Sequence, residues 1–227
     1  MLTLGFDTAT ELGTIGLVDG EEVKGEYTFR AKESQSEKLL GSIDLLLDKL
    51  EVDISEVGKI AVSRGPGSFT GLRIGISTAK GLAHGLEVPL AGVPLTTCYY
   101  SRVENYKGPV CTLIKDRRDL VYVAAFDKQG HKVIGETSTS IDNLEKKLKS
   151  KLEDTDAPVF LVGDAIPEHR DLLTKIGGVI LAKGEINYPS GSQVAYLGGN
   201  AKENEGELAS IEPLYAQRPI AEINWTE

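Results

Sequence analysis

One pattern of expected elements occurs twice along this 227-residue chain, and the repetition constrains its fold more than any other feature. In each half, apolar and β-branched runs predict three strands, of which the last two form a hairpin, then an amphipathic helix and a fourth strand. This order predicts an α/β protein with two duplicated lobes, each a mixed sheet flanked by helices. The expected strands span residues 2–6, 13–18, 22–29 and 59–63, then 110–114, 120–126, 131–137 and 158–162; the expected helices span 36–50 and 141–152.

The boundary between the lobes is expected near residues 102–109. This places an N-terminal lobe at residues 1–104 and a C-terminal lobe at residues 105–227. A further helix is expected at 192–201, followed by a tail whose single Trp225 would pin it to the body of the protein.

A glycine-rich stretch, RGPGSFTGLR at residues 64–73, follows the strand at 59–63 and opens a second helix. A strand, a glycine turn and a helix N-terminus together leave backbone N–H groups that suit an anion. The stretch is not a Walker A motif, because Leu72 and Arg73 follow Gly71 where that motif requires Lys and then Ser or Thr. A tight strand-to-helix connection without a ligand explains the glycines equally well. Both interpretations stay open.

The helix over residues 71–85 has two stripes when its residues are placed at about 100° intervals. Because Gly inside a helix costs about 1 kcal/mol relative to Ala, its glycines indicate the close approach of another helix. Either the helix at 36–50 or a second chain fits that description. The apolar stripe is Leu72, Ile76, Ala79 and Ala83, and the small stripe beside it is Gly71, Gly75, Thr78, Leu82 and Gly85.

The net charge, the apolar runs and the cysteines of the chain limit the kinds of function that it can have. The chain has 25 Lys and Arg against 34 Asp and Glu, a formal net charge of −9. Nucleic acid repels such a chain unless its basic residues cluster, so any role in RNA chemistry is expected to run through a partner. No apolar run is long enough to span a bilayer, and residues 1–7 do not resemble a signal peptide. Cys98 and Cys111 are not spaced for zinc or a disulfide framework, which favours a reducing cytoplasm.

Two lobes in this order resemble the actin-like architecture of sugar kinases and heat-shock ATPases, in which ATP is held between one hairpin turn from each lobe. Asp7 and Thr8 suit the first turn in position and type, although such an Asp also commonly caps its own loop. The second turn, at residues 115–119, has no Gly and carries bulky side chains where phosphates need bare backbone N–H groups. We therefore expect at most a vestigial nucleotide loop at Asp7 and Thr8, and no cofactor.

The sequence offers no catalytic or metal-binding constellation. His84, His131 and His169 lack the His-x-x-x-His spacing of a zinc site. Ser68 lacks the Gly-x-Ser-x-Gly elbow of a nucleophile. We expect no catalytic residue and no metal ligand, and therefore a chain that is not an enzyme by itself.

The chain resembles the TsaB family, the dimerisation subunits of the bacterial machinery that adds threonylcarbamoyl to the adenosine beside the tRNA anticodon. Residues 64–73 are nearly the family's motif entire, and weaker segments follow in the family's order over essentially the whole chain. Gln35 stands where the family usually has His, and Lys115 where an Asp commonly precedes an Arg pair, and both departures weaken any ligand chemistry. The weaker segments are Phe6-Asp7-Thr8, Gln35 to Leu40, Arg117-Arg118, Val121-Tyr122, Val162-Gly163-Asp164, Pro213-Leu214-Tyr215 and Ala221.

The resemblance implies an actin-like (ASKHA) fold of two ribonuclease H-like lobes without the metal-binding histidines and complete nucleotide site of the paralogue TsaD, the catalytic subunit. It implies a heterodimer with TsaD through the first two helices of each partner, recruitment of the ATPase TsaE, a homodimer when the protein is alone, and tRNA contact only through the complex. A second chain then covers the small stripe, with Arg73 at its rim. The expected interface is Thr70, Gly71, Arg73, Gly75, Thr78, Leu82 and Gly85.

Two other functions stay open. The fold suits an ATP-dependent kinase or ATPase. The third function is a metallopeptidase, because the superfamily has also carried a glycopeptidase label, but the scattered histidines disfavour it.

Overall fold

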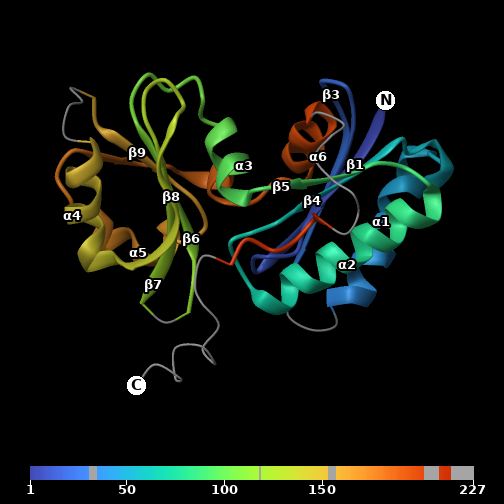
Figure 1. Cartoon of the computed structure of the whole chain (residues 1–227), viewed down its shortest axis with the longest axis horizontal. Helices are drawn as coiled ribbons and strands as arrows, with labels where there is room; N and C mark the ends of the chain where they lie inside the picture. The colour runs from blue at the N-terminus through green and yellow to red at the C-terminus, as the bar shows by residue number, and fades with distance from the viewer. Residues whose placement is uncertain (31–34, 118, 153–156, 202–209, 216–227) are drawn as a thin grey trace.

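The computed structural model describes residues 1–30, 35–117, 119–152, 157–201 and 210–215. Two five-stranded mixed sheets lie side by side, one in each half of the molecule (Figure 1). The first has the strand order β3-β2-β1-β4-β5 and the second the order β10-β9-β6-β7-β8. Read in the opposite direction, the second order repeats the first, so the predicted duplication and the predicted α/β class are confirmed.

The first sheet follows the pattern expected from the sequence. Its hairpin strands are antiparallel to their neighbours, whereas β4 and β5 are parallel to the strands beside them because helices connect them. The elements are β1 (Leu2–Asp7), β2 (Leu12–Asp19), β3 (Glu22–Arg30), α1 (Gln35–Leu50), the 3₁₀ turn Ile54–Glu56, β4 (Lys59–Ser63), α2 (Phe69–Leu86), β5 (Leu90–Val93) and α3 (Leu95–Ser101).

The second sheet repeats this arrangement, with β6 central and parallel to β9. Each predicted strand and helix of this half is present, with bounds shifted by up to three residues. The elements are β6 (Val110–Lys115), β7 (Leu120–Phe126), β8 (Lys132–Ser140), α4 (Ile141–Leu152), β9 (Val159–Val162), α5 (Ile166–Leu173), β10 (Val179–Leu181), the 3₁₀ turn Gly184–Asn187 and α6 (Gly191–Asn200).

Two helices cross between the halves. Helix α3 follows β5 of the first sheet but packs on β6 and β7, whereas α6 follows the second sheet and packs on β1, β2 and β4. Helices α1 and α2 therefore cover one face of the first sheet and α6 the other (Figure 1). The division into residues 1–104 and 105–227 stays a proposal. In either half, one helix, α3 or α6, covers the sheet of the other half.

Helix α6 lies unusually close to the first sheet because glycines face it. An ideal Cβ on Gly5 would come within 2.2 Å of the Ala195 backbone nitrogen, and one on Gly16 within 2.1 Å of the Ser192 backbone nitrogen. The Glu26 carboxylate of β3 accepts a hydrogen bond from that Ser192 N–H at 2.9 Å, at the N-terminus of α6. The cross-over helix is thus fixed by packing and by charge.

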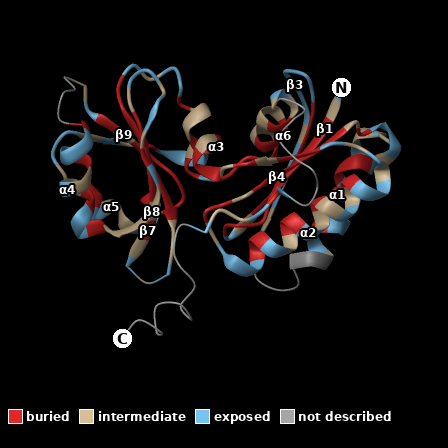
Figure 2. Cartoon of the chain, viewed as in Figure 1, coloured by how far each residue is buried: buried red, intermediate tan, exposed pale blue. Residues whose placement is uncertain are grey.

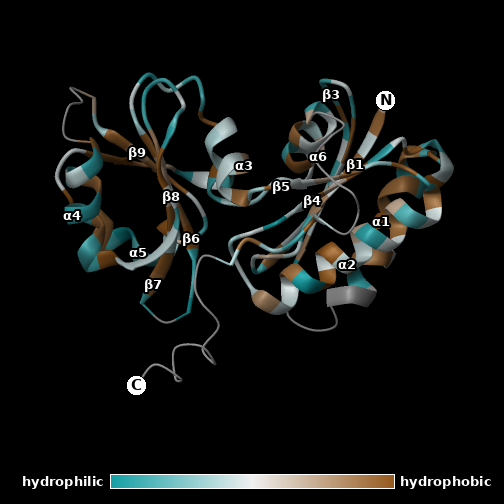
Figure 3. Ribbon diagram, viewed as in Figure 1, coloured by the Kyte–Doolittle hydropathy of each residue, from teal (hydrophilic) through white to brown (hydrophobic). Residues whose placement is uncertain are grey.

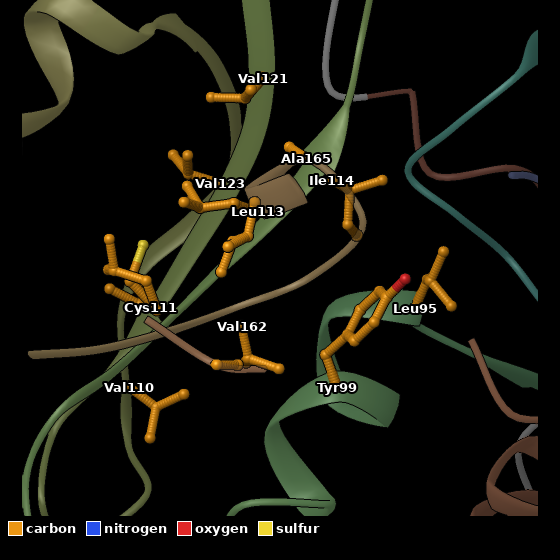
Figure 4. Close-up of a cluster of buried hydrophobic side chains, with 14 of the residues drawn as sticks. Leu95, Tyr99, Val110, Cys111, Leu113, Ile114, Val121, Val123, Val162 and Ala165 are labelled. Atoms are coloured by element: carbon orange, nitrogen blue, oxygen red, sulfur yellow. The ribbon is translucent and has the colours of Figure 1, made fainter. Parts of the chain in front are cut away.

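Buried residues concentrate in the sheets and on the helix faces turned toward them (Figure 2), and much of this buried part of the chain is apolar (Figure 3). Leu95 and Tyr99 of α3 are fully buried. Figure 4 shows both beside Leu113, Ile114 and Val162 of the second sheet. The cross-over of α3 therefore supplies part of the second half's core.

Some elements escaped prediction, namely β5, α3, α5 and β10. Trp225 and the end of the tail lie outside the described residues. Within the described part of the chain, no helix combines the length and the apolar character that crossing a membrane requires.

Candidate functional site

The β1–β2 turn lies where the sequence predicts a nucleotide loop. Asp7 ends β1 and is fully buried. Its carboxylate accepts hydrogen bonds from the Ala9 N–H at 3.2 Å and the Thr10 hydroxyl at 3.4 Å. The Thr8 hydroxyl donates to the Gly71 carbonyl at 2.7 Å. Asp7 thus caps its own loop and Thr8 fastens that loop to α2, while their nucleotide role stays a prediction.

Lys115 occupies the matching position of the second sheet, because it ends β6 as Asp7 ends β1. Its ammonium lies 3.4 Å from Glu11 Oε1 and 3.1 Å from Glu168 Oε2. Glu11 follows β1 in the first half, and Glu168 belongs to α5 in the second, so Lys115 joins the two halves. The backbone N–H of Lys115 donates to Asp164 Oδ1 at 2.9 Å. The side chain expected to obstruct the second turn is therefore held between carboxylates.

Two buried carboxyl groups give this junction an unusual electrostatic character. Burial raises the pKa of Asp7 to about 6, although hydrogen bonds within its loop act in the opposite direction. Burial raises the pKa of Asp164 to about 7; the charges of Asp7 and Glu11 add to this effect, and Lys115 opposes it. At the junction between the halves, two carboxyl groups therefore ionise less readily than exposed aspartates do.

The glycine-rich connection before α2 uses several of its N–H groups in hydrogen bonds within the protein. The Ser68 N–H donates to the Ala9 carbonyl at 2.7 Å, and the Ser68 hydroxyl caps the helix by accepting the Gly71 N–H at 3.3 Å. Gly67 approaches the same turn so closely that a Cβ there would lie 2.4 Å from the Ala9 carbonyl oxygen. Of the two interpretations left open by the sequence, the tight connection therefore explains these glycines.

The small stripe of α2 needs a correction. Gly71 and Gly75 are buried, and an ideal Cβ would lie 2.0 Å from the Thr8 carbonyl oxygen in the first case and 2.4 Å from Thr8 Oγ1 in the second. The expectation that these two glycines contact a partner is wrong. They are small because the β1–β2 turn lies against them, and this neighbour is neither of the two that the sequence suggested.

The rest of the expected interface lies toward the outside of α2. Gly81, a glycine of the same helix that is not part of the small stripe or the expected interface, is also exposed, and an ideal Cβ at Gly81 or Gly85 meets nothing within 4 Å. Thr70, Arg73 and Gly85 are exposed, whereas Thr78 and Leu82 are half-buried.

Helix α1 continues this outer surface. Gly41 is exposed, with nothing within 4 Å of an ideal Cβ. Leu40 and Leu45 are 47% and 41% exposed. We call the outward sides of the two helices the α1–α2 face, defined by Leu40, Gly41, Leu45, Gly81 and Gly85. Gln35 is the first residue of α1, and its side chain is not among the described parts of the structure.

A stack of three side chains lies at the start of α2. The Arg73 Cζ lies 3.9 Å from the centre of the Phe69 ring, and the Tyr215 ring centre lies 5.4 Å from that of Phe69. Sequence reasoning placed Arg73 at the interface rim but missed both aromatic residues. No local pattern could pair residues so far apart in the chain, although Tyr215 lies in a segment that resembles the TsaB family.

The described residues offer little for binding a metal or for thiol chemistry. Within the described residues, no group of three or more His, Cys, Asp and Glu side chains is placed to hold a metal ion. Cys98 and Cys111 are buried and unbridged. Burial raises the pKa of both thiols, which disfavours the reactive thiolate.

Comparison with known proteins gives consistent matches over the whole chain. A family model described as TsaD, tRNA N6-adenosine threonylcarbamoyltransferase, matches residues 29–225. A protein called tRNA threonylcarbamoyladenosine biosynthesis protein TsaB, from Bacillus subtilis strain 168, is 27% identical and covers 100% of this chain and 99% of its own length. A protein of the same name from Escherichia coli K12 is 26% identical and covers 97% of this chain and 96% of its own length.

Solved structures share the fold. An uncharacterised protein from Pseudomonas aeruginosa, described as similar to peptidase YeaZ, superposes with a TM-score of 0.75 at 23% identity, covering 95% of this chain and 99% of its own. The ethanolamine utilisation protein EutJ of Carboxydothermus hydrogenoformans superposes with a TM-score of 0.53 at 14% identity, covering 87% and 90%. The actin-like fold expected from the sequence is thereby confirmed.

Proposed function

Because the chain belongs to the TsaB family, we propose that it serves tRNA threonylcarbamoyladenosine biosynthesis as a non-catalytic subunit that binds TsaD. In this proposal the α1–α2 face docks on TsaD, the pair recruits the ATPase TsaE, and TsaD transfers threonylcarbamoyl to the adenosine adjacent to the anticodon. The chain works in the cytoplasm, reaches tRNA only through the complex, and uses the same face to form a homodimer when TsaD is absent.

The openness of the α1–α2 face is the observation that carries this proposal. Gly41 and Gly81 lie inside helices, exposed and without a neighbour at the Cβ position. Gly in such a position costs about 1 kcal/mol of helix stability relative to Ala, and nothing within the described fold compensates. A second helix pair packing closely against the glycines would compensate for the cost, because small residues let backbones approach. The exposed Leu40 and Leu45 supply apolar area for such a contact.

The junction between the halves supports a role without catalysis. Lys115 is engaged by Glu11 and Glu168, and Asp7 is engaged by its own loop. Both side chains that could approach a nucleotide, Lys115 and Asp7, are thus engaged in contacts within the protein. For binding a partner, the junction needs only to hold the helices in position.

A second candidate is an ATP-dependent kinase or ATPase, favoured by the actin-like fold and by Asp7 at the end of β1. Calorimetric titration of the isolated chain with Mg-ATP separates the two candidates. The proposal expects no binding at micromolar affinity, whereas tight binding would favour the enzyme. A metallopeptidase would need clustered ligands, and the described residues supply no such cluster.

A pull-down of the full chain from its native host tests the proposed function. We expect TsaD and TsaE among the proteins identified by mass spectrometry, and a fall in threonylcarbamoyladenosine content of bulk tRNA when the chain is depleted. An unchanged content of the modified nucleoside on depletion, with neither partner recovered, would contradict the proposal.

A further inference from the structure

We propose that the Arg73–Phe69–Tyr215 stack is an anchor of the partner interface and that it receives a carboxylate side chain of the docked protein. The inference rests on the proposed function, because it assigns a chemistry to the end of the α1–α2 face where α2 begins. It also brings the C-terminal segment at residues 210–215 into that interface.

The C-terminal segment holds Tyr215 in place. Ile211 is only 4% exposed and belongs to the core of the first half. The Leu214 N–H donates to the Arg64 carbonyl at 2.8 Å, and Arg64 Nε donates to the Glu212 carbonyl at 2.7 Å. Tyr215 is therefore presented by a backbone that is fastened to the connection before α2. A surface ordered before binding loses little entropy when a partner arrives.

The two aromatic rings are held but not hidden. Phe69 is 49% exposed and Tyr215 is 48% exposed. Aromatic residues that are fixed in the free protein and covered in the complex supply much of the energy of protein interfaces, as Arg does. The stack thus has the composition of an interface anchor.

Arg73 supplies the charge. Its guanidinium carbon lies over the Phe69 ring, and a guanidinium in contact with an aromatic face can still donate hydrogen bonds from its N–H groups. Among the described residues, no carboxylate oxygen lies within 4 Å of Arg73, although the chain has a net charge of −9. The planar N–H fork matches a carboxylate with two parallel hydrogen bonds.

The anion is a carboxylate of a protein rather than an RNA phosphate, because the surroundings disfavour a polyanion. Glu212 lies exposed in the same segment as Tyr215, and the whole chain is acidic. A phosphate backbone brings many negative charges and would be repelled. A single carboxylate set in an apolar partner surface brings one charge, which Arg73 can match.

Calorimetric titration of the full chain with its TsaD partner tests the anchor. Arg73→Ala should weaken binding roughly tenfold or more. Arg73→Lys should recover only part of the loss, because an ammonium lacks the planar fork. Tyr215→Ala should weaken binding severalfold although Arg73 is retained. Lys128→Ala and Tyr188→Ala are the matched controls in the other half, since one removes an exposed positive charge and the other an exposed aromatic ring, and both should bind as the unsubstituted chain does.

Zero-length carbodiimide coupling identifies the ligand. With Arg73→Lys in the complex, the introduced amine should couple to an Asp or Glu of the partner, and mass spectrometry should recover that cross-linked peptide. Unchanged affinity of both Arg73→Ala and Tyr215→Ala would overturn the inference while leaving the proposed function in place. So would a loss confined to tRNA binding by the assembled complex, because the anion would then be a phosphate. Failure of the unsubstituted chain to bind TsaD would instead overturn the proposed function, and this inference with it.

Discussion

Gly75 of α2 lies so close to Thr8 of the β1–β2 turn that an ideal Cβ on Gly75 would come within 2.4 Å of Thr8 Oγ1. The same Thr8 hydroxyl donates to the Gly71 carbonyl at 2.7 Å. Through these contacts the turn that resembles a nucleotide loop sets the position of α2. The proposed docking helix is thus held by the part of the fold that actin-like enzymes use for ATP.

Gly75→Ala should therefore destabilise the protein, by ~1–3 kcal/mol in the free energy of unfolding, because the added methyl overpacks the turn. Gly81→Ala is the matched control in the same helix, where an ideal Cβ meets nothing within 4 Å. It should leave the free energy of unfolding unchanged or raise it by up to about 1 kcal/mol. Urea denaturation followed by circular dichroism measures both, and equal effects would contradict the assigned packing.

Stability should depend on pH through Asp164. Its pKa is raised to about 7 in the folded protein, above its ordinary value of 3.8, so the folded state binds the proton more tightly than the unfolded state does. The resulting stabilisation is fully present below pH 4 and is lost as the pH rises toward 7. Asp164→Asn should therefore raise the Tm at pH 8 and make its fall between pH 4 and 7 less steep, while Asp7, whose pKa burial raises to about 6, keeps part of that dependence.

The control for that measurement is Asp119→Asn, at an exposed carboxylate. Its Tm should follow the unsubstituted protein at every pH. A Tm of Asp164→Asn that falls below the unsubstituted protein at pH 8 would show that the ionised carboxylate, held by the Lys115 N–H, stabilises the fold after all.

Lys115→Ala should not create an ATPase. The substitution removes the side chain that joins Glu11 and Glu168, but residues 115–119 still contain no Gly to bring bare N–H groups to phosphates. Because both acidic partners are largely exposed, the loss of stability should stay below about 1 kcal/mol. Phosphate release from Mg-ATP should remain at background, and measurable turnover would mean that this side chain was the sole obstacle.

The regular elements of the fold could be predicted because they are long and periodic, as in α1, α4 and the β1 to β3 strands. Elements shorter than about two repeats of their own periodicity could not be predicted. Examples are β10, with three residues, and α3, with seven. The exchange of α3 and α6 between the halves was also beyond prediction. Which sheet a helix covers depends on contacts between distant segments, and no local pattern records them.

The candidate site shows the same limit. A helical projection grouped Gly71 and Gly75 with Gly85, because it orders residues around the axis. It does not say what lies outside each position, and here Thr8 covers the first two while Gly85 stays open. The position of Lys115 at the second turn could be read from the sequence, and the proposal that its side chain obstructs that turn needed only side-chain size. The ion pair of Lys115 with Glu11 could not be predicted, because Glu11 lies in the other half of the chain.

The most direct test of the proposed docking role is the affinity of TsaD for Gly81→Leu, measured by calorimetry on the full chain. An ideal Cβ at Gly81 meets nothing within 4 Å, and Leu favours a helix more than Gly does. The Gly81→Leu monomer should therefore fold at least as stably as the unsubstituted monomer, yet bind TsaD at least tenfold more weakly. Gly135→Leu, at an exposed and equally open glycine of β8 in the other half, should bind normally. Normal binding by Gly81→Leu would contradict the account, because the α1–α2 face could then not be the surface on which the partner docks.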